Sequence, residues 1–197
     1  MLRLLASFII SCFCLPLQAQ FQGLIINEFS QGNAGNQEYI ELLVVGNRTC
    51  TDSTADLRGW IIDDQNGWYG ITNSGPGHYR FANDPNWAAV PFGSLIVLYN
   101  AGDKNPSITA ADDITDANLD QVYIVPIGNT VNFIEQNSIE PDNLSGPAYS
   151  YPSTGYGSTT AQWPFIIGLS NASDVISVVN PSNPATAYFS IGYSYVI

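Results

Sequence analysis

The stretch Glu38-Tyr39-Ile40-Glu41-Leu42 determines the fold class, because its side chains follow a period of two residues. Ile40 and Leu42 fall on one face of a strand, and Tyr39 and Glu41 fall on the other. This is the pattern of a strand with one buried face. The strand is predicted over 39–45 and is closed by Gly46-Asn47.

Other short apolar runs lie on both sides of this strand and alternate with turn-rich stretches. They are residues 24–29, 60–63, 95–99, 121–125, 131–134, 165–169, 175–179 and 188–196. Runs rich in Val, Ile and Tyr at this spacing predict an all-β sandwich or barrel. We interpret 121–125 and 131–134 as a pair bridged by 126–129.

Helical signals are few. Asp84-Pro85 supplies a cap residue and a proline at the first helical position, so one helical turn is predicted there. A second short turn is predicted over 109–116. The chain has no sustained 3.6-residue stripe, which disfavours an α/β fold.

The charge balance excludes one large class of partners. Among 197 residues there are 17 acidic side chains and 5 Lys and Arg, for a formal net charge of -12. Nucleic-acid binding requires clustered Lys and Arg, and this chain has a single lysine, Lys104. The same shortage disfavours binding to an anionic membrane surface.

Residues 1–19 are predicted to be a secretory signal peptide, with the mature domain over 20–197. Arg3 precedes an apolar run that ends before Pro16, and Ala19 offers a cleavage site. The run is too short for a membrane anchor, so no transmembrane segment is expected in the mature chain. Cleavage removes Arg3 and no acidic residue, so the charge becomes 4 minus 17, or -13. The protein is expected to be secreted, periplasmic or on the cell surface.

The cysteines allow a second route to the cell surface and limit disulfide formation. Ile9-Ile10-Ser11-Cys12 loosely matches the processing site of a lipoprotein, so lipidation on Cys12 stays open as a second route to the surface. After cleavage near Ala19, Cys50 is the only cysteine left, and an internal disulfide is impossible. We interpret Cys50 as buried and inert.

Several motifs, in order, resemble a known family. They are Ile25-Ile26-Asn27-Glu28, residues 38–42, residues 56–63, residues 92–98 and, more weakly, residues 168–176. Together they are similar to the lamin tail domain, an immunoglobulin-like β-sandwich of nuclear lamins and of bacterial secreted proteins. The resemblance implies a binding and scaffold module without catalytic residues. The loop-rich stretch 100–162 departs from a compact member and is interpreted as an insertion.

Residues within these motifs have structural interpretations. Gly59 permits a positive backbone angle or close packing, and Trp60 is expected to fill the space between sheets. Glu28 and Glu41 could be taken for an acid and base pair. We interpret them as two carboxylates that accept hydrogen bonds from backbone or hydroxyl groups.

The sequence contains no convincing catalytic constellation, so an enzyme is not predicted. His78 is the only histidine, and it lies in a turn that leads into a strand. No nucleophile elbow, phosphate-binding glycine loop or dinucleotide motif is present. His78 is interpreted as an exposed residue without function.

One candidate metal site is an acidic cluster, made by Asp112, Asp113, Asp116 and Asp120. Calcium prefers six to eight oxygen ligands, which aspartates and loop carbonyls supply. Residues 63–67 form a second oxygen-rich turn. A solvated acidic loop without metal is the alternative interpretation.

Loop aromatics form a candidate ligand-binding set, namely Trp68, Tyr69, Tyr79, Trp87, Tyr151 and Tyr156. Rings among Gly, Asn and Ser are typical of adaptable recognition surfaces, and they can stack on sugars. The alternative is that individual rings pack over the ends of the sandwich as anchors.

Two functions follow from these observations. The first is a secreted or cell-surface binding or adhesion module of lamin-tail type, with a protein or a carbohydrate as partner. The second is an accessory domain of a larger surface hydrolase, with calcium as a stabilising ion. Residues 190–197 keep a strand pattern with no polar tail, so a longer protein is compatible with the sequence.

Overall fold

The fold is an all-β sandwich. A computed structural model describes residues 22–33, 37–49, 52–64, 78–127, 134–137, 167–169, 173–182 and 187–194. For residues 63–64, 78–79, 134–137 and 173 it describes the backbone alone. In these ranges no helix is long and apolar enough to cross a membrane. The predicted all-β class is confirmed.

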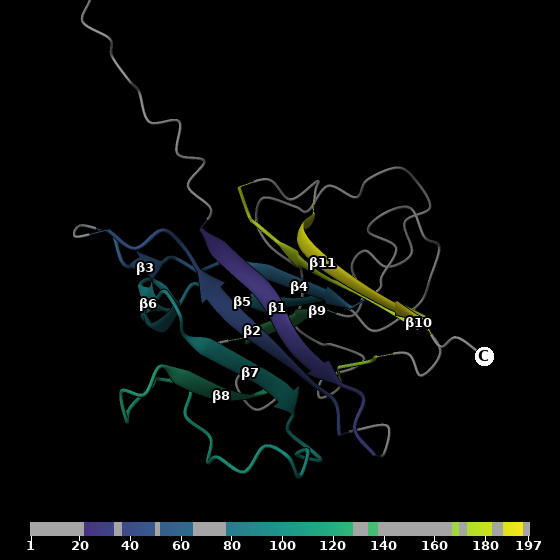
Figure 1. The fold of residues 1–197 in the computed structure, drawn as a ribbon. Coiled ribbons are helices and arrows are strands. Elements are labelled where there is room, and N and C mark those ends of the chain that lie inside the picture. Colours follow the sequence, from purple (N-terminus) through teal and green to yellow (C-terminus); the bar gives the residue numbers. More distant parts are fainter. Residues whose placement is uncertain are drawn as a thin grey trace, which may run out of the picture.

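Two sheets make the two layers of the sandwich (Figure 1). The first has the order β1 (Gly23–Ser30), β2 (Tyr39–Val45), β7 (Leu95–Asn100), β8 (Val122–Ile127). The second has the order β11 (Ala187–Ser194), β10 (Ser173–Val179), β4 (Ile61–Asp64), β5 (His78–Phe81), β9 (Ile134–Asn137). A small third sheet pairs β3 (Thr54–Ala55) with β6 (Val90–Pro91). All pairs are antiparallel except β7 with β8.

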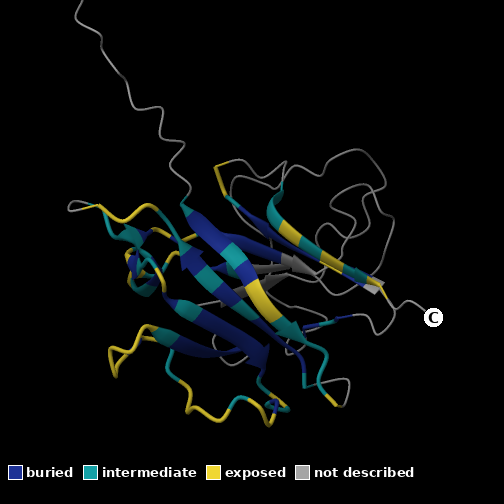
Figure 2. Ribbon diagram, viewed as in Figure 1, coloured by how far each residue is buried: buried dark blue, intermediate teal, exposed yellow. Residues whose placement is uncertain are grey.

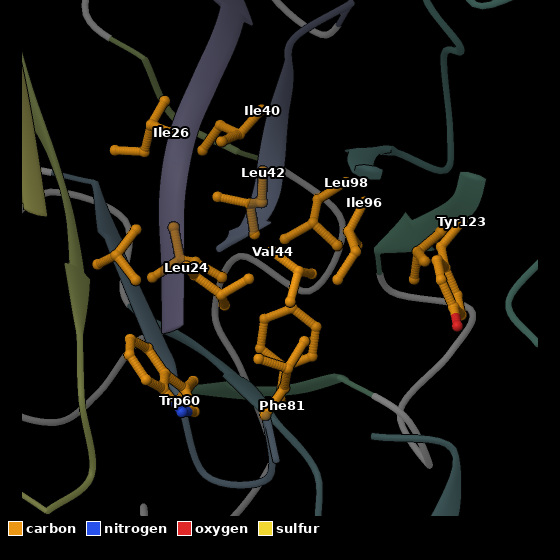
Figure 3. Packing of buried hydrophobic residues seen from close by; sticks show 14 of the residues in the cluster. Leu24, Ile26, Ile40, Leu42, Val44, Trp60, Phe81, Ile96, Leu98 and Tyr123 are labelled. Atoms are coloured by element: carbon orange, nitrogen blue, oxygen red, sulfur yellow. The ribbon is translucent and has the colours of Figure 1, made fainter. Parts of the chain in front are cut away.

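The main core lies between the two large sheets. On β2, Ile40, Leu42 and Val44 are buried and belong to this core, which confirms the alternation read from the sequence. Figure 3 shows how their side chains meet others from both sheets. The other labelled members of the cluster are Leu24, Ile26, Trp60, Phe81, Ile96, Leu98 and Tyr123.

A second, smaller core lies on the outer face of the first sheet. Tyr39, Val97, Tyr99 and Ile124 are buried there, with Ile108 packed against them. The segment 101–121, which connects β7 to β8, supplies Ile108 and much exposed surface (Figure 2). Because β7 is covered on both faces, it has a continuous apolar run in place of alternation.

The pairing predicted for 121–125 and 131–134 is wrong where the structure describes it, which is at Ile134, since residues 131–133 lie outside the described part. β8 pairs with β7 in parallel, and β9 pairs with β5 in the opposite sheet. Both strands lie within the stretch 100–162, and β8 adds Tyr123, Val125 and Ile127 to the main core. Contacts that bury β8 on both faces therefore outweigh the short connection to β9.

Two other local predictions differ from the structure. Residues 167–169 are not a strand, although Ile167 and Leu169 are buried in the core. These residues are apolar because their side chains fill the interior of the sandwich. Residues 109–116 contain no helix, and Asp113 instead forms an isolated bridge with Ile124.

The predicted helical turn is confirmed as the 3₁₀ helix η1 (Pro85–Trp87). The Asp84 carboxylate caps it by accepting a hydrogen bond from the Asn86 backbone N–H at 2.9 Å. Pro85 occupies the start of the helix, where a missing N–H is harmless.

Candidate functional site

The candidate site is built on the tight turn that precedes β4. The Leu57 side chain is fully buried and anchors the turn in the core. Gly59 has a φ of +78°, the left-handed conformation that glycine adopts without penalty, as the sequence suggested. Its N–H donates to the Phe81 carbonyl at 2.8 Å, and the Trp60 N–H donates to the Leu57 carbonyl at 3.1 Å.

Asp56 and Arg58 project from this turn as an ion pair. The Arg58 Nε donates to Asp56 Oδ1 at 2.8 Å, and Nη2 donates to Oδ2. The Arg58 backbone N–H also donates to Oδ1, at 3.1 Å. The side chains are 41% and 49% exposed for Arg58 and Asp56. The hydrogen bonds from the Arg58 side chain are the main reason that the pKa of Asp56 is lowered.

Trp60 fills the space between the sheets, as expected from the sequence. Its ring is 4% exposed and makes an edge contact with Tyr188 of β11, with 5.0 Å between centroids. Its indole Nε1 donates to the Asp56 carbonyl at 3.1 Å. One edge of the ring thus orients the turn that carries Asp56 and Arg58.

A surface cleft of about 280 Å³ opens beside this turn, at the start of β1. We call it the polar cleft. Its lining includes Gln22, Asp56, Arg58, Trp60, Asn180 and Ser182. They come from the start of β1, the turn before β4 and the turn after β10, so the tertiary fold brings three distant segments together.

The polar groups of the cleft are held in place by hydrogen bonds. The Gln22 Nε2 donates to both carboxylate oxygens of Asp52, at 3.1 and 3.0 Å, and to the Thr54 carbonyl at 3.3 Å. On the other side, the Asn180 Oδ1 accepts from the Ser182 backbone N–H at 2.8 Å. Side chains fixed in this way lose little entropy when a ligand binds.

The chemistry of the cleft suits recognition of a neutral polar molecule. Arg58 and Asp56 neutralise one another, and amide and hydroxyl groups provide the other donors and acceptors. Because the guanidinium already binds a carboxylate, the cleft offers no free charge to a second anion. Its lining contains no cysteine or histidine to act as a nucleophile or base.

Of the loop aromatics predicted to bind ligand, Trp87 is corrected by the structure. Its ring is fully buried and contacts Phe81 and Tyr123, with centroid distances of 4.8 and 5.8 Å. A ring enclosed on all sides cannot stack on a sugar, so Trp87 follows the packing alternative. Tyr79 lies in β5, and its side chain is outside the described part. Four more predicted rings lie outside the described residues, namely Trp68, Tyr69, Tyr151 and Tyr156.

The four aspartates predicted to bind calcium accept hydrogen bonds from their own loop and from the adjoining ends of β7 and β8. Asp112 accepts from the Tyr99 hydroxyl at 2.7 Å and from Lys104 Nζ at 3.0 Å. The other three, Asp113, Asp116 and Asp120, accept from backbone N–H groups of 115–122. In the ranges that the structure describes, no group of three or more His, Cys, Asp or Glu side chains is placed to hold a metal ion. The loop is thus held together by its own aspartates.

Glu28 and Glu41 face one another across β1 and β2, and both accept hydrogen bonds; the predicted hydroxyl donor is found for Glu28, whereas the donor to Glu41 is a side-chain amide. Glu28 accepts from the Tyr39 hydroxyl, and Glu41 accepts from the Asn27 amide at 2.5 Å. His78 begins β5, and its side chain is outside the described part, as is Cys50 entirely.

Sequence reasoning missed most of the cleft. Gln22, Asn180 and Ser182 carry no motif, and they come close only through the fold. The usable local signal was Asp56-Leu57-Arg58-Gly59, because a glycine three residues after an aspartate favours a turn, and this turn exposes Arg58. Comparisons with protein-family models, curated proteins and solved structures gave no significant match.

Proposed function

We propose that this protein is a non-catalytic binding module of the cell surface or the secreted fraction, and that the polar cleft binds one sugar unit of a glycan. The proposal includes the resemblance to the lamin tail domain, whose β-sandwich is the scaffold that carries the cleft. The observation that carries the proposal is the preorganised, charge-neutral cleft beside Trp60.

The size and the lining of the cleft both favour this class of ligand. At about 280 Å³ it lies just below the usual range of small-molecule sites, roughly 300 to 1,000 Å³, which suits one ring-sized unit. Sugar hydroxyls both donate and accept hydrogen bonds. Asp56 offers acceptors, Arg58 offers donors, and the Asn180 amide offers both.

The proposed location rests on the sequence of residues 1–19. If this segment is removed in export, the mature protein begins near Gln20, two residues before the first cleft residue. Mass spectrometry of the exported protein tests this part independently of binding. A mature chain that keeps residues 1–19 would contradict it.

The binding test uses a glycan array followed by calorimetry on the sugars retained. The variant is Arg58→Met, which keeps the aliphatic stem and removes the donors. Its matched control is Arg48→Met, at an exposed position outside the cleft. We expect Arg58→Met to weaken binding by about tenfold to a hundredfold, the effect of losing hydrogen bonds to a charged group, and Arg48→Met to have no effect.

Thermal melts followed by circular dichroism establish that both variants are folded. Asn180→Ala provides a second cleft variant that leaves the ion pair intact. Absence of glycan binding at millimolar concentration would overturn the proposal. So would binding that Arg58→Met and Asn180→Ala both leave unchanged.

A further inference from the structure

A carboxyl group is buried far from the polar cleft, just before β2. Glu38 is only 4% exposed. The described groups that face it are the Asn100 side chain at the end of β7, the Leu169 backbone and the Asp174 carboxylate of β10. The one charged group among them, Asp174, has the same sign. A buried carboxylate is normally paired with a cation, so this arrangement requires another explanation.

Asn100 connects Glu38 to residues 167–169. Its side chain is 1% exposed, and its Nδ2 donates to the Ile167 carbonyl at 3.3 Å. Its Oδ1 accepts from the Ile167 backbone N–H. The Asn100 backbone N–H donates to the Glu38 carbonyl at 3.3 Å. Glu38 itself accepts from Leu169 and Asn100, so two side chains fasten the same short segment.

The held segment is part of the sandwich interior. Ile167 and Leu169 are both buried in the main core, although the segment 167–169 is neither strand nor helix. Asn100 bonds the backbone of Ile167, and Glu38 bonds the backbone of Leu169. Release of this segment would expose two core side chains.

One oxygen of Glu38 has no hydrogen-bond partner within the described part of the chain. This atom, Oε2, is fully buried. An unsatisfied buried acceptor is costly, and more so when it carries charge. A proton on Oε2 removes the charge, turns the acceptor into a donor and abolishes the repulsion from Asp174.

Protonation of Glu38 at neutral pH is consistent with its surroundings. Desolvation by burial is the main reason that the pKa of Glu38 is raised to about 8 from its ordinary 4.5, and Asp174 raises it further. The hydrogen bonds from Leu169 and Asn100 oppose this rise and are too weak to cancel it. The carboxyl group is therefore neutral over most of the range in which an extracellular protein works.

We propose that Glu38, Asn100 and Asp174 form a proton-dependent latch. Neutral Glu38 stays buried against residues 167–169, whereas ionised Glu38 is driven toward water by its burial and by Asp174, which outweigh its hydrogen bonds from Leu169 and Asn100, and the segment is released. We call these three residues the acid latch.

The acid latch should stabilise the folded protein at low pH and lose this effect as the pH rises. Because the folded state holds a proton that the unfolded chain gives up at lower pH, the contribution is complete below pH 4.5. This contribution is lost as the pH rises toward about 8. The folding equilibrium constant falls by up to about tenfold for each pH unit over that range.

The test measures urea unfolding between pH 5 and pH 9 for the wild type and for Glu38→Gln. Glutamine has the shape of the protonated acid and cannot ionise. We expect the wild-type folding constant to fall roughly several hundredfold more than that of Glu38→Gln over this range. The control is Glu41→Gln, the same substitution on a partly exposed residue three positions away. The folding constant of Glu41→Gln should fall with pH as steeply as that of the wild type.

Hydrogen exchange locates the effect. After correction for intrinsic rates, the amides of Ile167 and Leu169 should lose protection as the pH rises in the wild type, and keep it in Glu38→Gln. If Glu38→Gln does not fold, Asp174→Asn replaces it. That variant removes the repulsion but keeps the oxygen that accepts from the Val175 N–H at 2.8 Å. The pH at which residues 167–169 lose protection should therefore move to a lower value.

Two results would overturn the latch. The first is a pair of parallel stability curves for the wild type and Glu38→Gln. The second is a rise in melting temperature when calcium is added at pH 8, abolished by Glu38→Gln, because this would assign the carboxylates to a cation in place of a proton.

Discussion

Gly23 of β1 lies directly against the ring of Trp60. A Cβ built on Gly23 would stand 2.1 Å from the Cη2 atom of Trp60, well inside the contact distance of two carbons. The ring fills the place of the missing side chain, and its Nε1 remains bonded to Asp56. This contact therefore joins the first strand to the turn that carries the polar cleft.

Gly23→Ala should destabilise the protein, because the new methyl group must displace a ring that is only 4% exposed. Overpacking of this kind costs about 1–3 kcal/mol of unfolding free energy. Urea denaturation measures it. Gly102→Ala is the matched control, since no atom lies within 4 Å of a Cβ at that position. Equal stability of the two variants would show that Trp60 moves aside freely.

Substitution of Gly59 should cost stability through backbone strain alone. Its φ is +78°, and the nearest atom to an added Cβ is in Pro181 at an ordinary 3.5 Å. We expect Gly59→Ala to lose about 1–2 kcal/mol. Gly59→Asn should lose less, because asparagine tolerates the left-handed conformation. Thermal melts provide the comparison, and an asparagine variant no more stable than alanine would point to a steric clash.

Trp87→Ala should damage the core and leave the cleft chemistry unchanged. Removal of a buried tryptophan leaves a cavity and costs about 3–5 kcal/mol. Glycan affinity measured on the fraction that remains folded at low temperature should match the wild type. A selective loss of affinity with little change in unfolding free energy would restore Trp87 as a ligand-binding residue.

Ligand binding by the cleft should not vary between pH 5 and pH 8. Arg58 lowers the pKa of Asp56 below its ordinary 3.8, so the ion pair is intact above that pH and is lost only as the pH falls through the lowered value. Calorimetry at pH 5, 6.5 and 8 should give affinities within about twofold. The stability of the protein should change over the same range through Glu38, which separates the two sites. A tenfold change in affinity would indicate a titrating group in the cleft.

Local sequence determined the parts of this fold that depend on neighbouring residues. The alternation in 39–45 predicts a strand with one buried face because side chains of a strand point to opposite sides in turn. Asp84-Pro85 predicts a capped helical turn because a carboxylate and a fixed φ satisfy the first residues of a helix. Gly59 before Trp60 permits a positive backbone angle or close packing, and the apolar run that follows predicts a buried ring. In each case the physical cause lies within a few residues.

The tertiary structure alone decided the parallel pairing of β7 with β8, the burial of Trp87 and both candidate sites. The Asn100 amide holds Ile167 across 67 positions of the chain, and the polar cleft joins three separate segments. Such contacts form because each sheet must bury its apolar face against a partner. The choice of partner depends on the packing of the whole chain, which no local period of the sequence encodes.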